Sequence, residues 1–335
     1  MKIGLSYDLK EAVLLDQGQP EDALEEYDSL ETVEAIARAL EAEGHSVVKL
    51  GGGREFLLSI LLENVDLVFN IAEGRGNYRS REAQVPSVLE MLHIPYLGSD
   101  PQCLAVCLDK PLTKKVVAAS GIHTPRWQVV SSCGELREIP WDDFPFPAFV
   151  KPAHEGSSKG VRLSSRVENM EQMAEMVTVL LERYQQPVMV EEFIAGDEVT
   201  VGIVGNCPPK FVGIMRVLPK KRGTYFVYSI EVKRDWECMV DYECPAQLEA
   251  GILQEIMDSS LKVFQVLGCH DFARLDFRIS PEGVPYFLEI NPLPGLNPKS
   301  SDLPIMVTKM GLTYQALISA ILNSALERLA QCVRR

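Results

Sequence analysis

The stretch RLDFRISPEGVPYFLEINPLPG, residues 274–295, decides the fold of the C-terminal half, because it is typical of two β-strands joined by a tight turn. The proline-glutamate-glycine sequence in its middle is a turn signal, so we predict a β-hairpin. Side chains alternate between the two faces of a strand. We therefore expect Asp276 opposite Glu289 and Arg274 opposite Asn291 on one shared face. The other face of the first strand is apolar and carries Leu275, Phe277 and Ile279.

The paired acids of this hairpin need a partner. Two carboxylates about 4 Å apart repel by about 4 kcal/mol at an effective dielectric constant of 20. Such a pair is stable if one acid is protonated, if arginines intervene or if a cation lies between them. Asp276, Glu289 and Asn291 offer only oxygen ligands, which favours a hard ion such as Mg²⁺. The alternative is a solvated sheet face with an Arg274–Asp276 salt bridge, but the turn PLPG that follows favours a site, because it can bring backbone N–H groups to a substrate.

Composition excludes several classes of protein. The chain has 335 residues, which suits two or three domains. With 46% hydrophobic and 24% charged residues it can bury a core. The net charge of −14 argues against a partner nucleic acid. The first residues lack the layout of a signal peptide, and no apolar run reaches the ~20 residues of a membrane-spanning helix, so we expect a cytoplasmic protein without a membrane partner.

The eight cysteines show no CxxC spacing, and no nearby histidines complete a zinc pattern. We expect a reduced cytosolic protein in which no cysteine acts as a nucleophile.

The first 105 residues alternate strand and helix patterns, which predicts a parallel α/β domain. Residues 2–8 are expected to form the first strand. Residues 28–47 are expected to form a helix that Asp28 caps together with Glu31 and that Gly44 ends. The apolar face of this helix is expected to carry Leu30, Val33, Ala37 and Leu40.

Residues 106–187 are predicted to form a small α+β unit, with a short strand at 160–165. Strands dominate residues 188–335, where helices near 247–267 and 313–332 are expected to cover them. The unit 106–187 contains FVKPAHEGSSKG, residues 149–160, whose small residues and hydroxyls are typical of a phosphate cradle. A bland polar turn fits this stretch nearly as well, and it lacks the Walker A spacing.

Five motifs in order carry a family resemblance. They are LDK at 108–110, FVKPAHEGSSKGV at 149–161, VEEFIAGDEVTV at 190–201, ARLDFRI at 273–279 and FLEINPLPGL at 287–296. The ordered set resembles the ATP-grasp superfamily and, more narrowly, the D-alanine–D-alanine ligase family, from about residue 65 to the C-terminus. The resemblance implies an N-terminal α/β domain (1–105), a central ATP-grasp subdomain (106–187) and a C-terminal ATP-grasp subdomain (188–335), and it implies a homodimer.

The resemblance assigns a nucleotide site. Lys110 and Lys151 resemble the lysines that bind the phosphates, and Ser158 would lie beneath these phosphates. The remaining positions are the adenine-edge residues Glu191 and Ile194, the adjoining wall Phe193, the ribose-binding acid Glu198 and the lysine of the lid over ATP, Lys233.

The resemblance also assigns the catalytic centre. Asp276, Glu289 and Asn291 resemble the ligands of two Mg²⁺ ions, for which Mn²⁺ can substitute. Arg274 resembles the arginine that stabilises the tetrahedral intermediate, and Gly295 would add an oxyanion donor. The last two positions are Ser157, which would help to position a closing loop, and Ser301, which would lie near the substrate carboxylate.

The N-terminal third departs from the family. The stretch at 6–29 is longer and acidic, and Tyr27 lies near the position of the family's substrate-binding glutamate. Glu73, a candidate substrate residue, replaces the family histidine, and Arg234 replaces an aromatic residue after the lid lysine. From these changes we expect substrates other than D-alanine. Arg75, Arg79 and Arg81 are candidates to clamp an extra substrate carboxylate, with solvent-facing arginines as an equal alternative.

The sequence thus predicts an ATP-dependent carboxylate–amine ligase that forms a dipeptide or dipeptide-like bond through an acyl phosphate. Its partners would be small carboxylate and amine substrates. The alternatives are a true D-alanine–D-alanine ligase, a mycosporine–amino acid ligase and a nucleotide-binding protein without catalysis.

Overall fold

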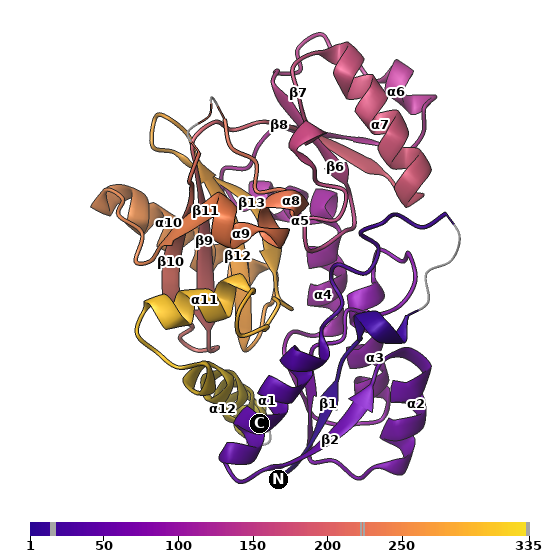
Figure 1. The fold of residues 1–335 in the computed structure, drawn as a ribbon, viewed down its shortest axis with the longest axis vertical. Coiled ribbons are helices and arrows are strands. Elements are labelled where there is room, and N and C mark those ends of the chain that lie inside the picture. The colour runs from indigo at the N-terminus through magenta and orange to yellow at the C-terminus, as the bar shows by residue number, and fades with distance from the viewer. Residues whose placement is uncertain (14–17, 222, 224, 333–335) are drawn as a thin grey trace.

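The computed structural model of the chain describes residues 1–13, 18–221, 223 and 225–332. Among these residues the strands form three sheets: one parallel sheet of four strands and two antiparallel sheets of four and five strands. Figure 1 shows the N-terminal sheet at the lower right, the central sheet at the top and the C-terminal sheet at the left. The predicted order of an α/β domain followed by two α+β units is confirmed.

The N-terminal sheet has the order β2-β1-β3-β4, and all its strands run parallel. Its core strand β1 buries Ile3 and Leu5 completely. The strands are β1 (Lys2–Ser6), β2 (Ser46–Gly51), β3 (Leu67–Asn70) and β4 (Tyr96–Leu97), and the helices between them are α1 (Leu30–Ala42), α2 (Gly53–Leu62) and α3 (Gln84–Met91).

Helix α1 begins one residue later than predicted. Ser29, not Asp28, is the N-cap, and its side chain accepts a hydrogen bond from the backbone N–H of Thr32. Asp28 is unavailable because its backbone pairs with the end of β1: its N–H donates to the carbonyl of Asp8 at 2.8 Å. Leu30 is 53% exposed and does not belong to the buried face, which consists of Val33, Ile36, Ala37 and Leu40. Gly44 follows the helix with a φ of +82°, as expected of a glycine stop.

The central sheet has the order β5-β8-β6-β7, and α6 (Glu135–Glu138) and α7 (Met170–Tyr184) accompany it. Its strands are β5 (Trp127–Val130), β6 (Ala148–Pro152), β7 (Arg166–Val167) and β8 (Val188–Glu192). The strand predicted at 160–165 is wrong, because residues Leu163–Ser165 form a 3₁₀ helix and only the two residues of β7 pair with β6. Strand β8 pairs with β5 and β6, so its residues extend the central sheet past the boundary expected at 187/188.

The C-terminal sheet has the order β11-β10-β9-β12-β13. Its strands are β9 (Asp197–Val204), β10 (Lys210–Pro219), β11 (Val240–Glu243), β12 (Phe272–Ile279) and β13 (Pro285–Asn291). The hairpin predicted from the sequence is β12–β13. Arg274 pairs with Asn291 and Asp276 with Glu289, as expected, and the ladder shifts by one residue directly after Asp276.

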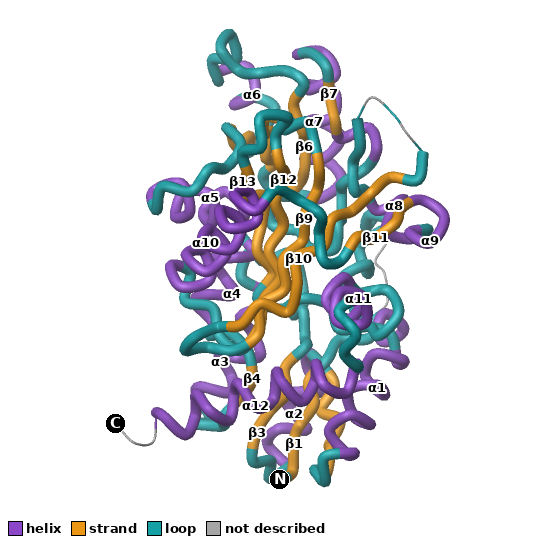
Figure 2. Tube along the Cα trace, turned by 90° about the vertical axis from the view of Figure 1, so that its left-hand side faces the viewer, coloured by secondary structure: helices purple, strands orange, loops and turns teal. Residues whose placement is uncertain are grey.

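Helices cover both faces of this sheet (Figure 2). One face packs against α10 (Ala250–Val266) and α5 (Lys110–Ala119), and the short helix α4 (Pro101–Leu108) also lies against β13. The polar side chains of β12 lie on the opposite face, where α11 (Asp302–Lys309) packs against β9 and β10. The sheet thus places the polar face of β12 between α11 and the central subdomain.

The last helix, α12 (Tyr314–Cys332), returns to the N-terminal domain and packs beside α1. Its residues Ile318 and Ile321 share one core with Ile3 and Phe69. The N-terminal domain is therefore completed by the C-terminal end of the chain. No single helix among the described residues is long and apolar enough to span a membrane, although α11 and α12 together, as a pair bent by 114°, meet the length and composition criteria.

Candidate active site

The polar face of the β12–β13 hairpin is enclosed rather than solvated. Arg274 contacts Asp276 at 2.9 Å and Asp302 at 3.3 Å, and the side chains of Arg274 and Asp276 are only 11% and 13% exposed. Thr200 donates a hydrogen bond to Asp276 at 2.9 Å. The salt bridge of the alternative interpretation is therefore present, but it does not lie on an open sheet face.

Glu289 is the second acid of this face, and Lys110 approaches it at 3.3 Å. Burial alone raises the pKa of Glu289, but the nearby cations Lys110, Lys151 and Arg274 lower it well below its usual range. Burial and the charge of Glu289 raise the pKa of Asp276. The neighbouring cations thus keep Glu289 ionised, and a bound metal cation would help to ionise Asp276 beside it. Together with the amide of Asn291, this oxygen set fits a hard divalent ion.

A smaller cavity lies between the central and C-terminal sheets, next to this face. The eight residues that the resemblance assigns to the nucleotide all line it, and Asp276 and Glu289 line its end. Tyr228 and Arg278 also line it, and neither was predicted from the sequence. The structure therefore brings together residues from 110 to 289; the role of each in binding a nucleotide stays a prediction.

Glu191 lines the smaller cavity and forms ion pairs with two lysines. It contacts Lys151 at 2.6 Å and Lys114 at 2.9 Å, and all three side chains are at least nine-tenths buried. Burial lowers the pKa of Lys114 to about 8, and the two lysines lower the pKa of Glu191 against the effect of its own burial. Sequence reasoning missed Lys114, although it lies one helical turn after Lys110 on α5 and so shares its face.

The polar turn after β6 has the features of a phosphate cradle. Ser157 and Ser158 have left-handed φ values of +48° and +59°, which side-chain-bearing residues adopt at a cost and which cluster at functional sites. Ser158 donates to the carbonyl of Tyr228 at 3.4 Å, and Ile230 donates to that of Val161 at 3.1 Å. These bonds hold the turn against the segment that precedes α8 (Ile230–Arg234).

Helix α8 is the candidate lid, because it carries Lys233 into both cavities. The ammonium of Lys233 lies 5.0 Å from the ring centre of Tyr228. The next residue, Arg234, forms an ion pair with Glu25 of the N-terminal loop, with its Nε 2.9 Å from the carboxylate. Glu25 is therefore an acid of this loop that contacts the lid. Tyr27, which lies near the position of the family's substrate-binding glutamate, donates its hydroxyl to the carbonyl of Gly74.

A larger cavity of about 360 Å³ adjoins the smaller one, and Lys110, Tyr228 and Lys233 line both. The larger cavity lies between the N-terminal domain and the polar face of β12 and β13. Its lining includes Glu73, Ser157, Arg274, Asn291, Gly295 and Ser301. The predicted catalytic residues and two of the three predicted substrate residues thus meet in one space. Gly295 lies so close to Ser301 that an added Cβ would come within 2.7 Å of its Oγ.

The predicted arginine clamp is not formed. Arg75, the third predicted substrate residue, does not line either of the two cavities; its guanidinium pairs with the buried Asp8 at 2.8 Å and stacks on the ring of Tyr27. Arg79 is largely exposed and Arg81 is buried in a network of its own. Acids of the N-terminal loop pair with Arg75 and Arg81, and Arg79 contacts Asp109, so these arginines already have acidic partners within the chain.

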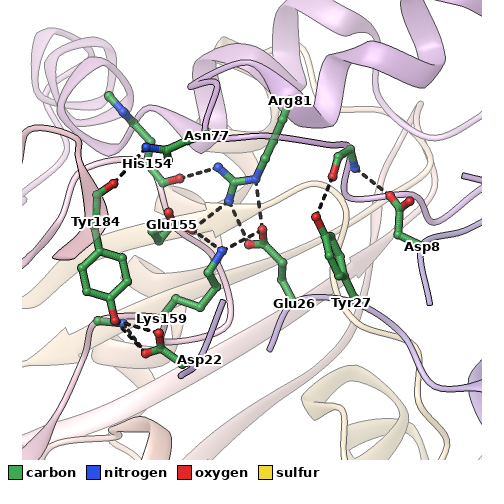
Figure 3. A network of polar contacts seen from close by, with 12 residues as sticks. Asp8, Asp22, Glu26, Tyr27, Asn77, Arg81, His154, Glu155, Lys159 and Tyr184 are labelled. Carbon is green, nitrogen blue, oxygen red and sulfur yellow. Dashed lines mark hydrogen bonds and ion pairs between the residues drawn. The ribbon is translucent and has the colours of Figure 1, made fainter. Parts of the chain in front are cut away.

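Figure 3 shows this network, which docks the N-terminal loop on the phosphate cradle. Arg81 donates to both oxygens of Glu26 at 3.0 and 2.8 Å and to Glu155 at 3.0 Å. Lys159 contacts the same two acids at 3.0 and 2.6 Å. Asp22 of the same loop accepts hydrogen bonds from the Tyr184 hydroxyl at 2.8 Å and the Gly160 N–H at 3.0 Å. The acidic loop, whose residues 14–17 lie outside the described residues, therefore joins two domains.

Three further acids of the larger cavity have no ion-pair partner among the described residues. Asp28, Glu73 and Glu82 line the cavity. Burial, with repulsion from Asp8, raises the pKa of Asp28 to about 7, and burial raises that of Glu82 to about 7 as well. Burial and the charge of Glu82 raise the pKa of Glu73 well above its usual range. This end of the cavity therefore attracts cationic groups.

The comparisons with known proteins agree with this geometry. Two antiparallel sheets that enclose a cavity lined by lysines and acids define an ATP-grasp protein. The family model described as "D-ala D-ala ligase C-terminus" matches residues 116–323. A protein of Aquifex aeolicus named D-alanine–D-alanine ligase is 37% identical over 301 residues, which cover 88% of this chain and 94% of that protein. One of Syntrophotalea carbinolica with the same name is 32% identical and covers 89% and 91% of the two chains.

Solved structures show the same fold. The D-alanine–D-alanine ligase of Bacillus anthracis in complex with ATP superposes with a TM-score of 0.74 at 22% identity and covers 99% of both chains. The VanG D-Ala:D-Ser ligase of Enterococcus faecalis gives a TM-score of 0.73 at 20% identity and covers 97% and 99%. The chain belongs to the D-alanine–D-alanine ligase family, and it is an ATP-dependent carboxylate–amine ligase.

Proposed function

We propose that the chain joins D-alanine to a second D-alanine at the expense of ATP, through an acyl phosphate. The observation that carries this proposal is the meeting of two cavities at Lys110, Tyr228 and Lys233, with the predicted nucleotide residues in one and the predicted catalytic residues in the other. The names of the relatives support D-alanine as the substrate better than our sequence-based expectation of other substrates.

The smaller cavity supports nucleotide binding by its chemistry. Phe193 and Ile194 offer apolar walls for a base, and Lys110 and Lys151 offer positive charge for phosphates. Asp276, Glu289 and Asn291 would hold two Mg²⁺ ions, which would neutralise the β- and γ-phosphates during transfer. Because Lys110 already contacts Glu289, the same lysine would link the ion site to the phosphates.

The chemistry takes place where the cavities meet. A carboxylate is a poor acyl donor, because its leaving group would be oxide. Its oxygen attacks the γ-phosphorus of ATP, the bond to the bridging oxygen breaks, and ADP leaves. The amine of the second substrate then attacks the acyl carbon, and phosphate leaves with the bonding electron pair. An oxyanion forms after the amine attacks and before phosphate leaves, and Arg274 and the backbone N–H of Gly295 would stabilise it. Loss of one such hydrogen-bond donor typically lowers the rate by a factor of about 10²–10³.

The test is ADP release from ATP and Mg²⁺ with D-alanine, with L-alanine as the control, followed by mass spectrometry of the product. The proposal predicts D-alanine-dependent ADP release and a product with the mass of the dipeptide. Binding of ATP without ADP release for D-alanine or any amino acid pool would contradict the ligase and favour a nucleotide-binding protein without catalysis. The homodimer and the cytoplasmic location stay predictions.

A second candidate is a ligase whose substrate carries an additional cationic group. The unpaired acids Asp28, Glu73 and Glu82 favour it, because a buried carboxylate without a partner is costly and an ammonium group would offset that cost. A panel of neutral amino acids and diamino acids separates the two candidates. Faster ADP release with diamino acids than with D-alanine supports the second, and loss of this preference in Glu82→Gln but not in the surface variant Glu90→Gln assigns it to these acids.

A further inference from the structure

Three cysteines gather beside the larger cavity, although they are far apart in the sequence. The sulfur of Cys103 lies 3.9 Å from that of Cys107 and 3.5 Å from that of Cys269. All three sulfur atoms lie within 4.8 Å of one another, and the residues are 2%, 4% and 5% exposed. The spacing of these cysteines in the sequence gave no sign of a metal site, because the third one comes from another segment of the chain.

We propose that Cys103, Cys107 and Cys269 form a site for one thiophilic divalent metal ion of the zinc type, separate from the oxygen-lined Mg²⁺ site. An all-sulfur donor set selects soft ions. Sulfur atoms bound to one zinc ion at about 2.3 Å with tetrahedral angles lie about 3.8 Å apart. Two of the three separations, 3.5 and 3.9 Å, bracket this value, and the third is no more than 4.8 Å, so the three sulfur atoms are close enough to bind one ion.

The backbone around the three sulfurs is fixed on both sides. Cys103 and Cys107 lie one helical turn apart on α4, the spacing at which two side chains of a helix bind one metal ion. Cys269 follows the end of α10, where Gly268 adopts a φ of +70° and the Cys269 N–H donates to the carbonyl of Phe264 at 2.9 Å. The site would therefore join two rigid segments.

Cys103 lies at the N-terminal end of helix α4. Asp100 caps α4 and accepts a hydrogen bond from the N–H of Cys103, so Cys103 lies in the first turn, where the helix dipole favours a thiolate. Binding of a divalent ion to three thiols would release three protons and leave a complex of net charge −1.

The cluster offers three ligands, and no fourth His, Cys, Asp or Glu joins them among the described residues. Cys107 lines the larger cavity, which gives a route for the ion and for a water molecule as fourth ligand. The site would tie α4 to the start of β12, the strand that carries Arg274 and Asp276. A metal ion here would thus fix the position of the catalytic strand relative to α4.

The experiment uses the full chain, reduced and freed of metal, in excess Mg²⁺ so that oxygen sites are already filled. Zinc is titrated, and X-ray absorption at the zinc edge identifies the neighbours of the bound ion. We expect one zinc ion per chain with three sulfur neighbours at about 2.3 Å. No uptake by the reduced chain, or a first shell of oxygen and nitrogen only, would overturn the proposal and leave the cysteines as apolar core residues.

Variants locate the ion. Cys103→Ser and Cys269→Ser should each weaken zinc binding by at least about a hundredfold, because each removes one thiolate. Cys133→Ser, which changes an exposed cysteine, should leave the affinity unchanged. If the buried variants fail to fold, the absorption spectrum of the unmodified chain still decides, because it counts sulfur neighbours directly. Equal affinity in Cys103→Ser and the unmodified chain would contradict the assignment.

Discussion

The network around Arg81 gives the most quantitative prediction. Arg81 is 2% exposed, and its guanidinium binds Glu26 through two hydrogen bonds, Glu155 through one and the carbonyl of His154 at 2.8 Å. With Lys159, two cations balance two acids. Arg81→Met leaves a buried excess negative charge, and the loss of one partner of a buried ion pair typically costs about 3–5 kcal/mol.

The pKa of Glu26 shows the same direction of effect for the network as a whole. Burial alone would raise it, but Arg81 and Lys159 lower it from 4.5 to about 2. A shift of this size at about 1.4 kcal/mol per unit corresponds to about 3 kcal/mol. Because the pKa is lowered on folding, this stabilisation is present above about pH 4.5 and is lost as the pH falls toward 2. The effect of Arg81→Met should therefore be constant between pH 6 and 8 and smaller at pH 3.

The network joins the N-terminal loop to the phosphate cradle, so the expected result is local opening of that contact. Hydrogen exchange of the backbone amides in 18–28 and 154–160 measures it. A cost of about 3–5 kcal/mol corresponds to a loss of protection of about two to almost four orders of magnitude. The matched control is Arg79→Met, whose side chain is 73% exposed and contacts Asp109 at 3.5 Å; an exposed pair of this kind contributes about 1 kcal/mol or less.

A double variant sharpens the test. Glu26→Gln removes the negative charge that Arg81→Met leaves without a partner. The double variant should therefore lose less amide protection than the sum of the losses in the two single variants. Equal protection in Arg81→Met and Arg79→Met would refute the view that this network holds the two domains together.

Three further predictions concern the cavities. Glu289→Gln should abolish ADP release while circular dichroism stays unchanged, whereas Glu282→Gln, on the exposed turn of the same hairpin, should keep full activity; activity retained by Glu289→Gln would exclude its role as a metal ligand. Lys151→Met should raise the KM for ATP by about tenfold or more, because it removes a buried cation at the cavity. The surface variant Lys220→Met should leave this KM unchanged. An unchanged KM in Lys151→Met would remove Lys151 from the phosphate site. Burial raises the pKa of Glu82 to about 7, so its ionisation destabilises the folded chain as the pH rises from about 4.5 to 7. In urea unfolding, Glu82→Gln should therefore leave the free energy of unfolding unchanged at pH 4 and raise it by up to about 3 kcal/mol at pH 8. An equal stabilisation at both pH values would contradict the raised pKa.

The hairpin and the N-terminal α/β domain could be predicted because local signals determine them. The period-two pattern and the turn of 274–291 fix which residues face each other, and the pairs Asp276–Glu289 and Arg274–Asn291 follow from that pattern. The nucleotide residues could be collected only through the family resemblance, since they come from four separate segments that no local pattern connects.

The errors come from tertiary contacts. Asp28 and Ser29 are both good N-caps, and only the pairing of Asp28 with the end of β1 decides in favour of Ser29. The arginine clamp failed because Glu26 is 55 residues from Arg81 in sequence and 133 from Lys159, so its charge could not be placed from the sequence. The three-cysteine cluster was missed for the same reason, since Cys269 is 166 residues from Cys103.

The central claim is that two neighbouring strands hold the ions that carry the phosphates of ATP. A crystal structure of the chain with a non-hydrolysable ATP analogue and Mg²⁺ tests it most directly. The expected density shows the base beside Phe193 and Ile194 and metal ions bound by Asp276, Glu289 and Asn291. Ions bound elsewhere, or a nucleotide outside the cavity between the two antiparallel sheets, would contradict the account.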